Sequence, residues 1–225
     1  TIATGQPAPG NLPNLPDRND TVVSPRAALL YRFNDQVSAW SALSWGFRAP
    51  TLNELYRQFR VGAILTLNNA DLGPERLVGG EFGVNIAPNS DFTFRATYFQ
   101  NRVKNPVSNV TIAVNTQQRQ NLGRTRVLGL QTDASYRVTP LLTLSGAYVF
   151  TDATVREFAA NPGIVGNFLP QVAKHRGSFN ATWADPSTLT VGFGLQFVGR
   201  QFDDDQNVRA VPGESEPGLP GYVLA

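Results

Sequence analysis

The sequence contains no cysteine, no methionine and a single histidine among its 225 residues. The absence of cysteine excludes disulfide bonds, thiolate metal sites and a cysteine nucleophile. The lone histidine, His175, stands between Lys174 and Arg176, whose positive charges would repel a metal cation. Because a metal site needs several ligands, we expect a structural or interfacial role for His175 and no metal site.

Charge is also scarce, since charged residues make up 16% of the chain and the formal net charge is +2. That excess is too small to favour a nucleic-acid partner. The chain has no apolar run of about eighteen residues that could form a transmembrane helix, and it has no secretory signal segment at its start. It also lacks the G-x-S-x-G and P-loop motifs, and it offers no histidine partner for a serine nucleophile, so we expect no enzymatic activity.

Because residue 1 is not methionine, the chain is interpreted as a piece of a longer protein. Its last residues, "GYVLA" at 221–225, resemble the opening of another strand.

What the sequence does contain is alternation with a period of two residues. In "LTVGFGLQFV" (189–198), apolar side chains alternate with Thr, Gly and Gln, which is typical of a strand with one apolar face. The same pattern predicts strands near 25–33, 37–48, 75–87, 92–104, 124–138, 141–152, 173–184 and 188–201. Several of these reach about 10 residues, the length that spans a bilayer when a strand is tilted.

The connections between these strands alternate strictly between short and long. Tight turns are expected at 34–36, 89–91, 139–140 and 185–187, and long links at 49–74, 105–123, 153–172 and 202–220. This alternation is typical of an up-and-down outer-membrane barrel with short periplasmic turns and long external loops. A soluble β-sandwich, which remains an alternative, gives no reason for every second loop to be long.

The placement of aromatic and charged residues agrees with a membrane barrel. Two aromatic girdles are predicted near the two ends of the strands, formed by Phe33, Phe92, Tyr136 and Trp183 and by Phe47, Tyr98, Phe150 and Phe197. The apolar face would then meet lipid, and the polar face would line the interior. Four charged residues are predicted to face the lumen: Arg95, Asp133, Arg137 and Arg176.

Several segments resemble the TonB-dependent outer-membrane receptors. The similarity is carried by "GFRAPTLNELYR" (46–57), "LNNADLGPERLVGGEFGV" (67–84), "NLGRTRVLGLQTDASYRV" (121–138) and "PQVAKHRGSFNATW" (170–183). The residues that match the family motif are Phe47, Arg48, Ala49, Pro50, Asn53, Glu54, Leu55 and Tyr56.

This resemblance implies an all-β, antiparallel transmembrane barrel of the 22-stranded, plugged type. Residues 1–225 would form an incomplete part of it, about eight strands plus the start of another, corresponding to roughly strands 12 to 19 and the start of strand 20. Residues 1–23 would be an external loop and strand lead-in, and the plug and the terminal strands would be missing. We therefore expect an open, curved sheet with two unpaired edges.

The resemblance also implies a function in the bacterial outer membrane, without a cofactor. The family imports ferric siderophores, cobalamin or haem with energy from the TonB complex, which would act through the missing plug. Haem receptors of the family carry a histidine between the "FRAP" and "NPNL" boxes, but none lies between residues 47–50 and the corresponding "NADL" at 69–72. A ferric siderophore is therefore favoured, and uptake of cobalamin or carbohydrate, or an outer-membrane barrel enzyme, remains an alternative.

The candidate ligand-binding residues are Tyr56, Arg57, Phe59 and Arg60, on the external link that follows Pro50. Arginine offers a fork of hydrogen-bond donors and the aromatic rings offer stacking faces, which suits an anionic, aromatic chelate. The carboxylates at 203–205 could bind calcium, but they lack a second acidic group at suitable spacing, so a solvated loop is expected there.

Overall fold

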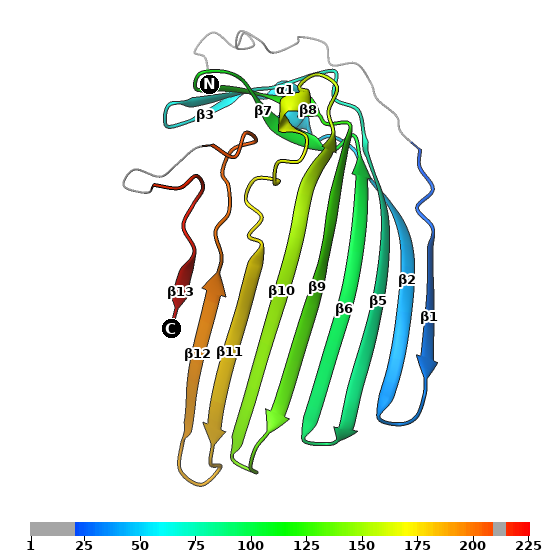
Figure 1. Cartoon of the computed structure of the whole chain (residues 1–225), viewed down its shortest axis with the longest axis vertical. Coiled ribbons are helices and arrows are strands. Elements are labelled where there is room, and N and C mark those ends of the chain that lie inside the picture. The colour runs from blue at the N-terminus through cyan, green and yellow to red at the C-terminus, as the bar shows by residue number, and fades with distance from the viewer. Residues whose placement is uncertain (1–20, 209–214) are drawn as a thin grey trace, which may run out of the picture.

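The computed structural model describes residues 21–208 and 215–225. Most of the predicted lead-in at 1–23 therefore lies outside the described residues. Nine strands form one long sheet, in which the strands lie side by side in the same order as in the sequence (Figure 1). The strands are β1 (Arg26–Arg32), β2 (Val37–Arg48), β5 (Glu75–Asn89), β6 (Phe92–Lys104), β9 (Arg124–Arg137), β10 (Leu142–Glu157), β11 (His175–Ala184), β12 (Thr190–Val198) and β13 (Tyr222–Leu224).

Every pair in this sheet is antiparallel, and the sheet does not close, because β1 and β13 are its edges. The expectation of an open, up-and-down sheet of about eight strands plus the start of another is confirmed. The short connections lie at one end of the strands and the long ones at the other, as the sequence predicted (Figure 1). No helix in the described part of the chain is long and apolar enough to cross a membrane.

Because the pairing register continues from strand to strand, alternate residues of each strand lie on the same face of the sheet. One cross-strand row contains Phe82, Tyr98, Leu130 and Phe150, which are successive partners on β5, β6, β9 and β10. Large apolar side chains on this outer face are exposed, with Tyr98 at 45% and Phe193 at 52% of full exposure. Solvent-exposed aromatic rings in such number are unfavourable in water, so this surface is suited to lipid.

The opposite, inner face is polar. Asn85, Arg95 and Asp133 are successive cross-strand partners there, and they line a hollow of about 770 Å³ near the short turns. Arg137 forms an ion pair with Asp91 at 3.6 Å, close to the same turns.

The first two long links contain regular structure that the alternating pattern of the sequence does not predict. Residues 49–74 contain α1 (Leu52–Tyr56), β3 (Phe59–Val61) and β4 (Ile64–Leu67), and residues 105–123 contain β7 (Val107–Ala113) and β8 (Thr116–Asn121). These strands form a second, four-stranded sheet in the order β3-β4-β8-β7, which lies across the loop end of the long sheet (Figure 1). The two links are joined by a parallel pairing of β4 with β8, which no local pattern in the sequence indicates.

The third link begins later than predicted, because β10 continues to Glu157 rather than ending near residue 152. A short 3-10 helix, η1 (Pro162–Ile164), follows it. Here Val155, Phe158 and Ile164 pack with Val110 and Leu122 of the second link, and these five residues form the buried apolar cluster of the described chain. Burial of apolar side chains in this cluster stabilises the loop end in the manner of a soluble protein.

Candidate functional site at the loop end

The end of β2 is fixed by a network of charged groups. Nη1 of Arg48 donates to both carboxylate oxygens of Glu54, at 3.1 and 2.9 Å, and Nη2 of Arg48 donates to Glu75 at the start of β5. The Glu75 carboxylate also accepts a hydrogen bond from the backbone N–H of Val107, at 2.8 Å. The network therefore joins β2, α1, β5 and β7 at one point.

Glu54 has a second role within α1. The hydroxyl of Thr51 accepts from the backbone N–H of Glu54 at 3.3 Å, and the Glu54 carboxylate accepts from the backbone N–H of Thr51 at 2.7 Å. This is a capping box, and it explains why a helix of five residues begins at Leu52, directly after its N-cap Thr51. Burial alone would raise the pKa of the Glu54 carboxyl, but hydrogen bonds from Arg48 and Thr51 outweigh it and hold the pKa below its ordinary value.

Arg119 of β8 binds backbone carbonyl groups at the C-terminal side of α1. Its guanidinium donates to the backbone carbonyls of Asn53 and Arg57, the latter at 3.0 Å, and lies 5.1 Å from the centre of the Phe59 ring. Burial lowers the pKa of Arg119, and the nearby Glu54 carboxylate offsets this only in part. No local sequence pattern indicates this role of Arg119, because its partners lie more than sixty residues earlier in the chain.

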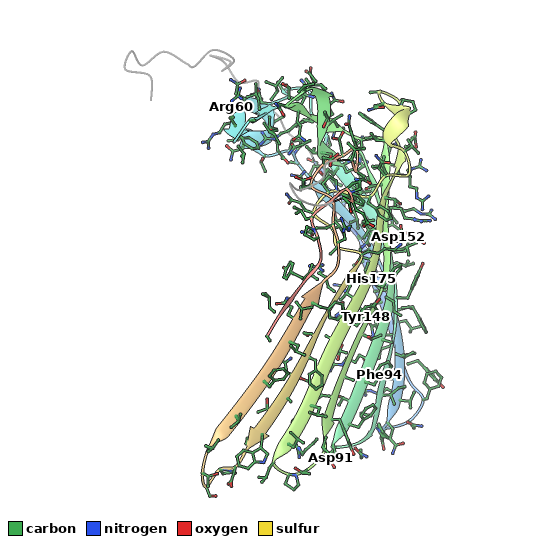
Figure 2. All side chains as sticks on the ribbon, turned by 60° about the vertical axis from the view of Figure 1, so that its left-hand side comes forward. Arg60, Asp91, Phe94, Tyr148, Asp152 and His175 are labelled. Carbon is green, nitrogen blue, oxygen red and sulfur yellow. The ribbon has the colours of Figure 1, made fainter. Side chains whose placement is uncertain are left out.

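The four predicted ligand-binding residues occupy this same region. Tyr56 ends α1, Arg57 follows it, and Phe59 and Arg60 begin β3. Both arginines are exposed, and the two aromatic side chains are half-buried. Arg60 donates to the backbone carbonyl of Ala63 at 3.2 Å and lies at the loop end, to one side of the long strands (Figure 2).

The other residues of the family motif support the structure around the end of β2 and the start of the first link. Leu55 is buried and Phe47 lies on the outer face beside Arg76. The ladder of β2 stops at Arg48, just before Ala49 and Pro50, as predicted, because proline has no N–H to donate. In the "NADL" segment, the Asn69 side chain donates to the backbone carbonyl of Arg119 at 3.0 Å, and Leu72 is fully buried.

A cavity of about 480 Å³ lies among the four long links. Glu54 and Arg119 contribute to its wall from one side, and Gln171 and the carboxylates at 203–205 contribute from another. Of the predicted family-motif and ligand-binding residues, Glu54 alone lines it. The structure thus separates an acidic cavity from the arginine and aromatic surface at residues 56–60.

The expectation that residues 203–205 form a solvated loop is wrong. Asp204 and Asp205 are 3% and 4% exposed. The Asp205 carboxylate accepts from the Thr111 hydroxyl at 2.6 Å and from the Thr111 N–H at 3.0 Å, which ties the fourth link to β7. These carboxylates fasten loops together, and no group of three or more potential metal-binding side chains was found in the described residues.

His175 faces outward. Its Nδ1 lies 2.7 Å from the Tyr148 hydroxyl, and the Phe150 ring is 5.5 Å away, so it belongs to the aromatic layer of the outer face (Figure 2). The four predicted lumen-facing residues share the opposite face. Arg95 and Asp133 are direct cross-strand partners, whereas Arg137 lies near the short turns and Arg176 pairs with Val198 near the loop end.

Comparison with known proteins identifies the family to which this architecture belongs. Residues 3–225 match a family described as "TonB dependent receptor-like, beta-barrel". The chain belongs to the TonB-dependent receptors. It therefore resides in the bacterial outer membrane, and it belongs to a family of non-enzymatic transporters.

The chain is similar in sequence to a curated relative and in fold to two solved structures. The heme/hemopexin utilization protein C of Haemophilus influenzae is 28% identical over 91% of this chain, which spans 30% of that relative's length. The ferric enterobactin receptor PfeA of Pseudomonas aeruginosa superposes with a TM-score of 0.66 at 18% identity, over 89% of this chain and 31% of the receptor. The ferric citrate transporter FecA superposes with a TM-score of 0.66 at 22% identity, over 89% of this chain and 29% of the transporter.

Proposed function

We propose that this chain is part of an outer-membrane receptor that takes up a ferric siderophore in a TonB-dependent manner. The observation that carries the proposal is the surface at residues 56–60. There, two exposed arginines alternate with two half-buried aromatic residues at the external end of the barrel wall. No ion pair links Arg57 or Arg60 to a carboxylate of the described residues, so their charges remain available to an anionic chelate.

The chain spans less than a third of the relatives named above, and both edges of its sheet lack a partner strand. We propose that residues 1–225 supply part of a barrel whose remaining strands and plug come from a longer protein. Contact with the TonB complex would then be made by that plug, and the polar inner wall with Arg95, Asp133 and Arg137 would face the plug or water.

Haem is a second candidate, because a relative carries that ligand in its name. Coordination of haem iron by this chain would need a histidine, tyrosine or similar ligand near the external site. The segment between "FRAP" and "NADL" has no histidine, and His175 is turned toward the lipid face. These observations favour a chelate held by arginine and aromatic groups over a haem held by histidine. Cobalamin and carbohydrate need no cluster of arginines, so they rank lower.

The test is a binding measurement on the full-length protein in detergent. A ferric tris-catecholate chelate, haem and cobalamin are each titrated against the wild type and against the double variant R57Q/R60Q. We expect binding of the ferric chelate alone, weakened at least about tenfold in the double variant, because each charge-assisted hydrogen bond contributes about 1.5–3 kcal/mol. The matched control R102Q/K104Q removes two outward-facing cations and should bind the chelate normally. Tight binding of haem and none of the chelate would refute the proposal.

A further inference from the structure

The outer face carries a basic patch at the loop end, which we define as Arg76, Arg102, Lys104, Arg124 and Arg126. Register places these side chains in two adjacent rows. In one row Arg76, Lys104 and Arg124 are successive partners on β5, β6 and β9, and in the row below Arg102 is paired with Arg126. They share a face with Tyr98 and Leu130, because the pairing of β6 with β9 is continuous from Phe92 to Lys104.

Such an arrangement is unfavourable without a partner. Like charges directly opposite each other across a strand pair repel. Two carboxylates offset part of the charge: Glu157 lies 3.3 Å from Arg124, and Asp152 lies 3.7 Å from Arg126. Five cations and two carboxylates leave a formal charge of +3.

The remaining cations have no carboxylate to neutralise them. Among the described residues, no carboxylate forms an ion pair with Arg76, Arg102 or Lys104, and all three side chains are exposed. The Nε atom of Arg126 is buried and has no hydrogen-bond partner in the described chain. Through its three exposed side chains, Arg76, Arg102 and Lys104, the patch presents hydrogen-bond donors and positive charge to the surroundings of the barrel.

The height of the patch identifies its surroundings. Phe92, beside the short turns, and Arg102 are ten residues apart on β6, about 34 Å of strand. A tilt of about 40° reduces this to about 26 Å across the membrane, which matches an apolar band about 25 Å tall. Arg102 and Arg126 thus lie where hydrocarbon ends on the external side, and the row above them lies among lipid headgroups. Figure 2 shows the same sequence of heights: Asp152, the partner of Arg126, lies nearest the loop end, Tyr148 lies below it, and Phe94 lies nearer the short turns.

We propose that the basic patch binds phosphate-bearing lipid headgroups of the outer leaflet. Phosphate is the complementary group on three grounds: it is anionic, it lies at this depth, and arginine forks bind it with two parallel hydrogen bonds. The patch faces away from the lumen, so it is separate from the surface at residues 56–60 and from any nutrient site. The proposal depends on residence in the outer membrane and is independent of the nutrient carried.

The experiment uses the full-length protein, delipidated in detergent and titrated with bisphosphorylated lipid A, with binding counted by native mass spectrometry. The variant is R76Q/R102Q/K104Q. A matched control, R32Q/R95Q/R176Q, removes the same charge from the opposite face. We expect the patch variant to bind on the order of a hundredfold more weakly than wild type, because each cation near an anionic surface contributes about fivefold. The control should bind as the wild type does.

Two further arms identify the chemistry. Lipid A without phosphates should bind poorly to the wild type, and inorganic phosphate should compete only weakly, because it lacks the acyl chains that contact the apolar face. The charge-conserving variant R76K/R102K/K104R should retain most of the binding, and it serves as the comparison if the neutral variant folds poorly. Equal binding of phosphorylated and dephosphorylated lipid A would overturn the proposal. So would unchanged binding by the patch variant, or preference for a soluble polyanion over lipid A.

Discussion

Arg48 and Glu54 face each other at the point where β2 leaves the membrane, with Nη1 of Arg48 3.1 and 2.9 Å from the two carboxylate oxygens. The same carboxylate caps α1 through Thr51, and the same guanidinium reaches Glu75 on β5. The network therefore joins α1 of the first long link to β2 and β5, the two strands that flank this link. The Glu54 side chain is 19% exposed, so its carboxylate is partly shielded from water. Its hydrogen bonds therefore contribute more to stability than those of a fully exposed ion pair.

Replacing Glu54 separates its two roles. E54A removes both the bond to Arg48 and the cap on Thr51, and we expect the opening free energy of residues 49–61 to fall by about 1–2 kcal/mol. E54Q keeps an amide oxygen that can still accept from the Thr51 N–H, so its loss should be about half as large. Hydrogen exchange of the full-length protein in detergent measures both. Equal protection in E54A and wild type would show that the cap does not hold the helix.

The pH dependence follows from the lowered pKa of Glu54. A carboxyl whose pKa is lower in the folded than in the unfolded state contributes stability above the unfolded value, and the contribution is lost as pH falls through the folded value. We therefore expect protection of residues 49–61 to be constant near neutral pH and to decrease below the ordinary glutamate pKa. E54Q should not show this decrease, because its side chain does not titrate. A decline of the same size in both proteins would assign the effect to other carboxylates.

The long sheet could be predicted from sequence because each strand carries its own signal. Alternation from Leu189 to Phe197 and the proline at position 50 both act locally, and both have the predicted effect. The loop structure depends on contacts between distant segments. The parallel partners Leu65 and Thr116 are fifty-one residues apart, and Thr111 and Asp205 are separated by 94. No local periodicity encodes such pairs.

One part of the loop end does carry a local sequence signal. Thr51 and Glu54 have the spacing of a capping box directly after the strand-ending proline, which predicts a helix start. Arg119 had no such signal, because an arginine in "TQQRQN" reveals its role only when the carbonyls of α1 are placed beside it. The ligand-binding role of Tyr56, Arg57, Phe59 and Arg60 stays a prediction.

Close packing on the inner face makes a further prediction at Gly129. A Cβ there would collide with the Phe150 carbonyl oxygen and the Phe99 ring, and the carbonyl belongs to a paired backbone that cannot move away. We expect G129A to lower the free energy of unfolding by about 1–3 kcal/mol. G192A is the matched control, since a Cβ at Gly192 meets nothing within 4 Å. Urea unfolding of the two variants in vesicles measures the difference, and equal midpoints would contradict the packing described here.

The assignment of faces is tested by two neighbouring residues of β6. Ala96 shares the outer face with Phe94 and Tyr98, whereas Thr97 lies on the inner face and lines the hollow beside Arg95. An arginine at Ala96 would be placed near the middle of the bilayer, at an expected cost of about 2–4 kcal/mol in folding free energy. An arginine at Thr97 would meet a polar wall and should cost less than about 1 kcal/mol. Unfolding of A96R and T97R in phosphatidylcholine vesicles decides between the two assignments of the faces, because a barrel with its apolar face toward the lumen would reverse the order of the two costs.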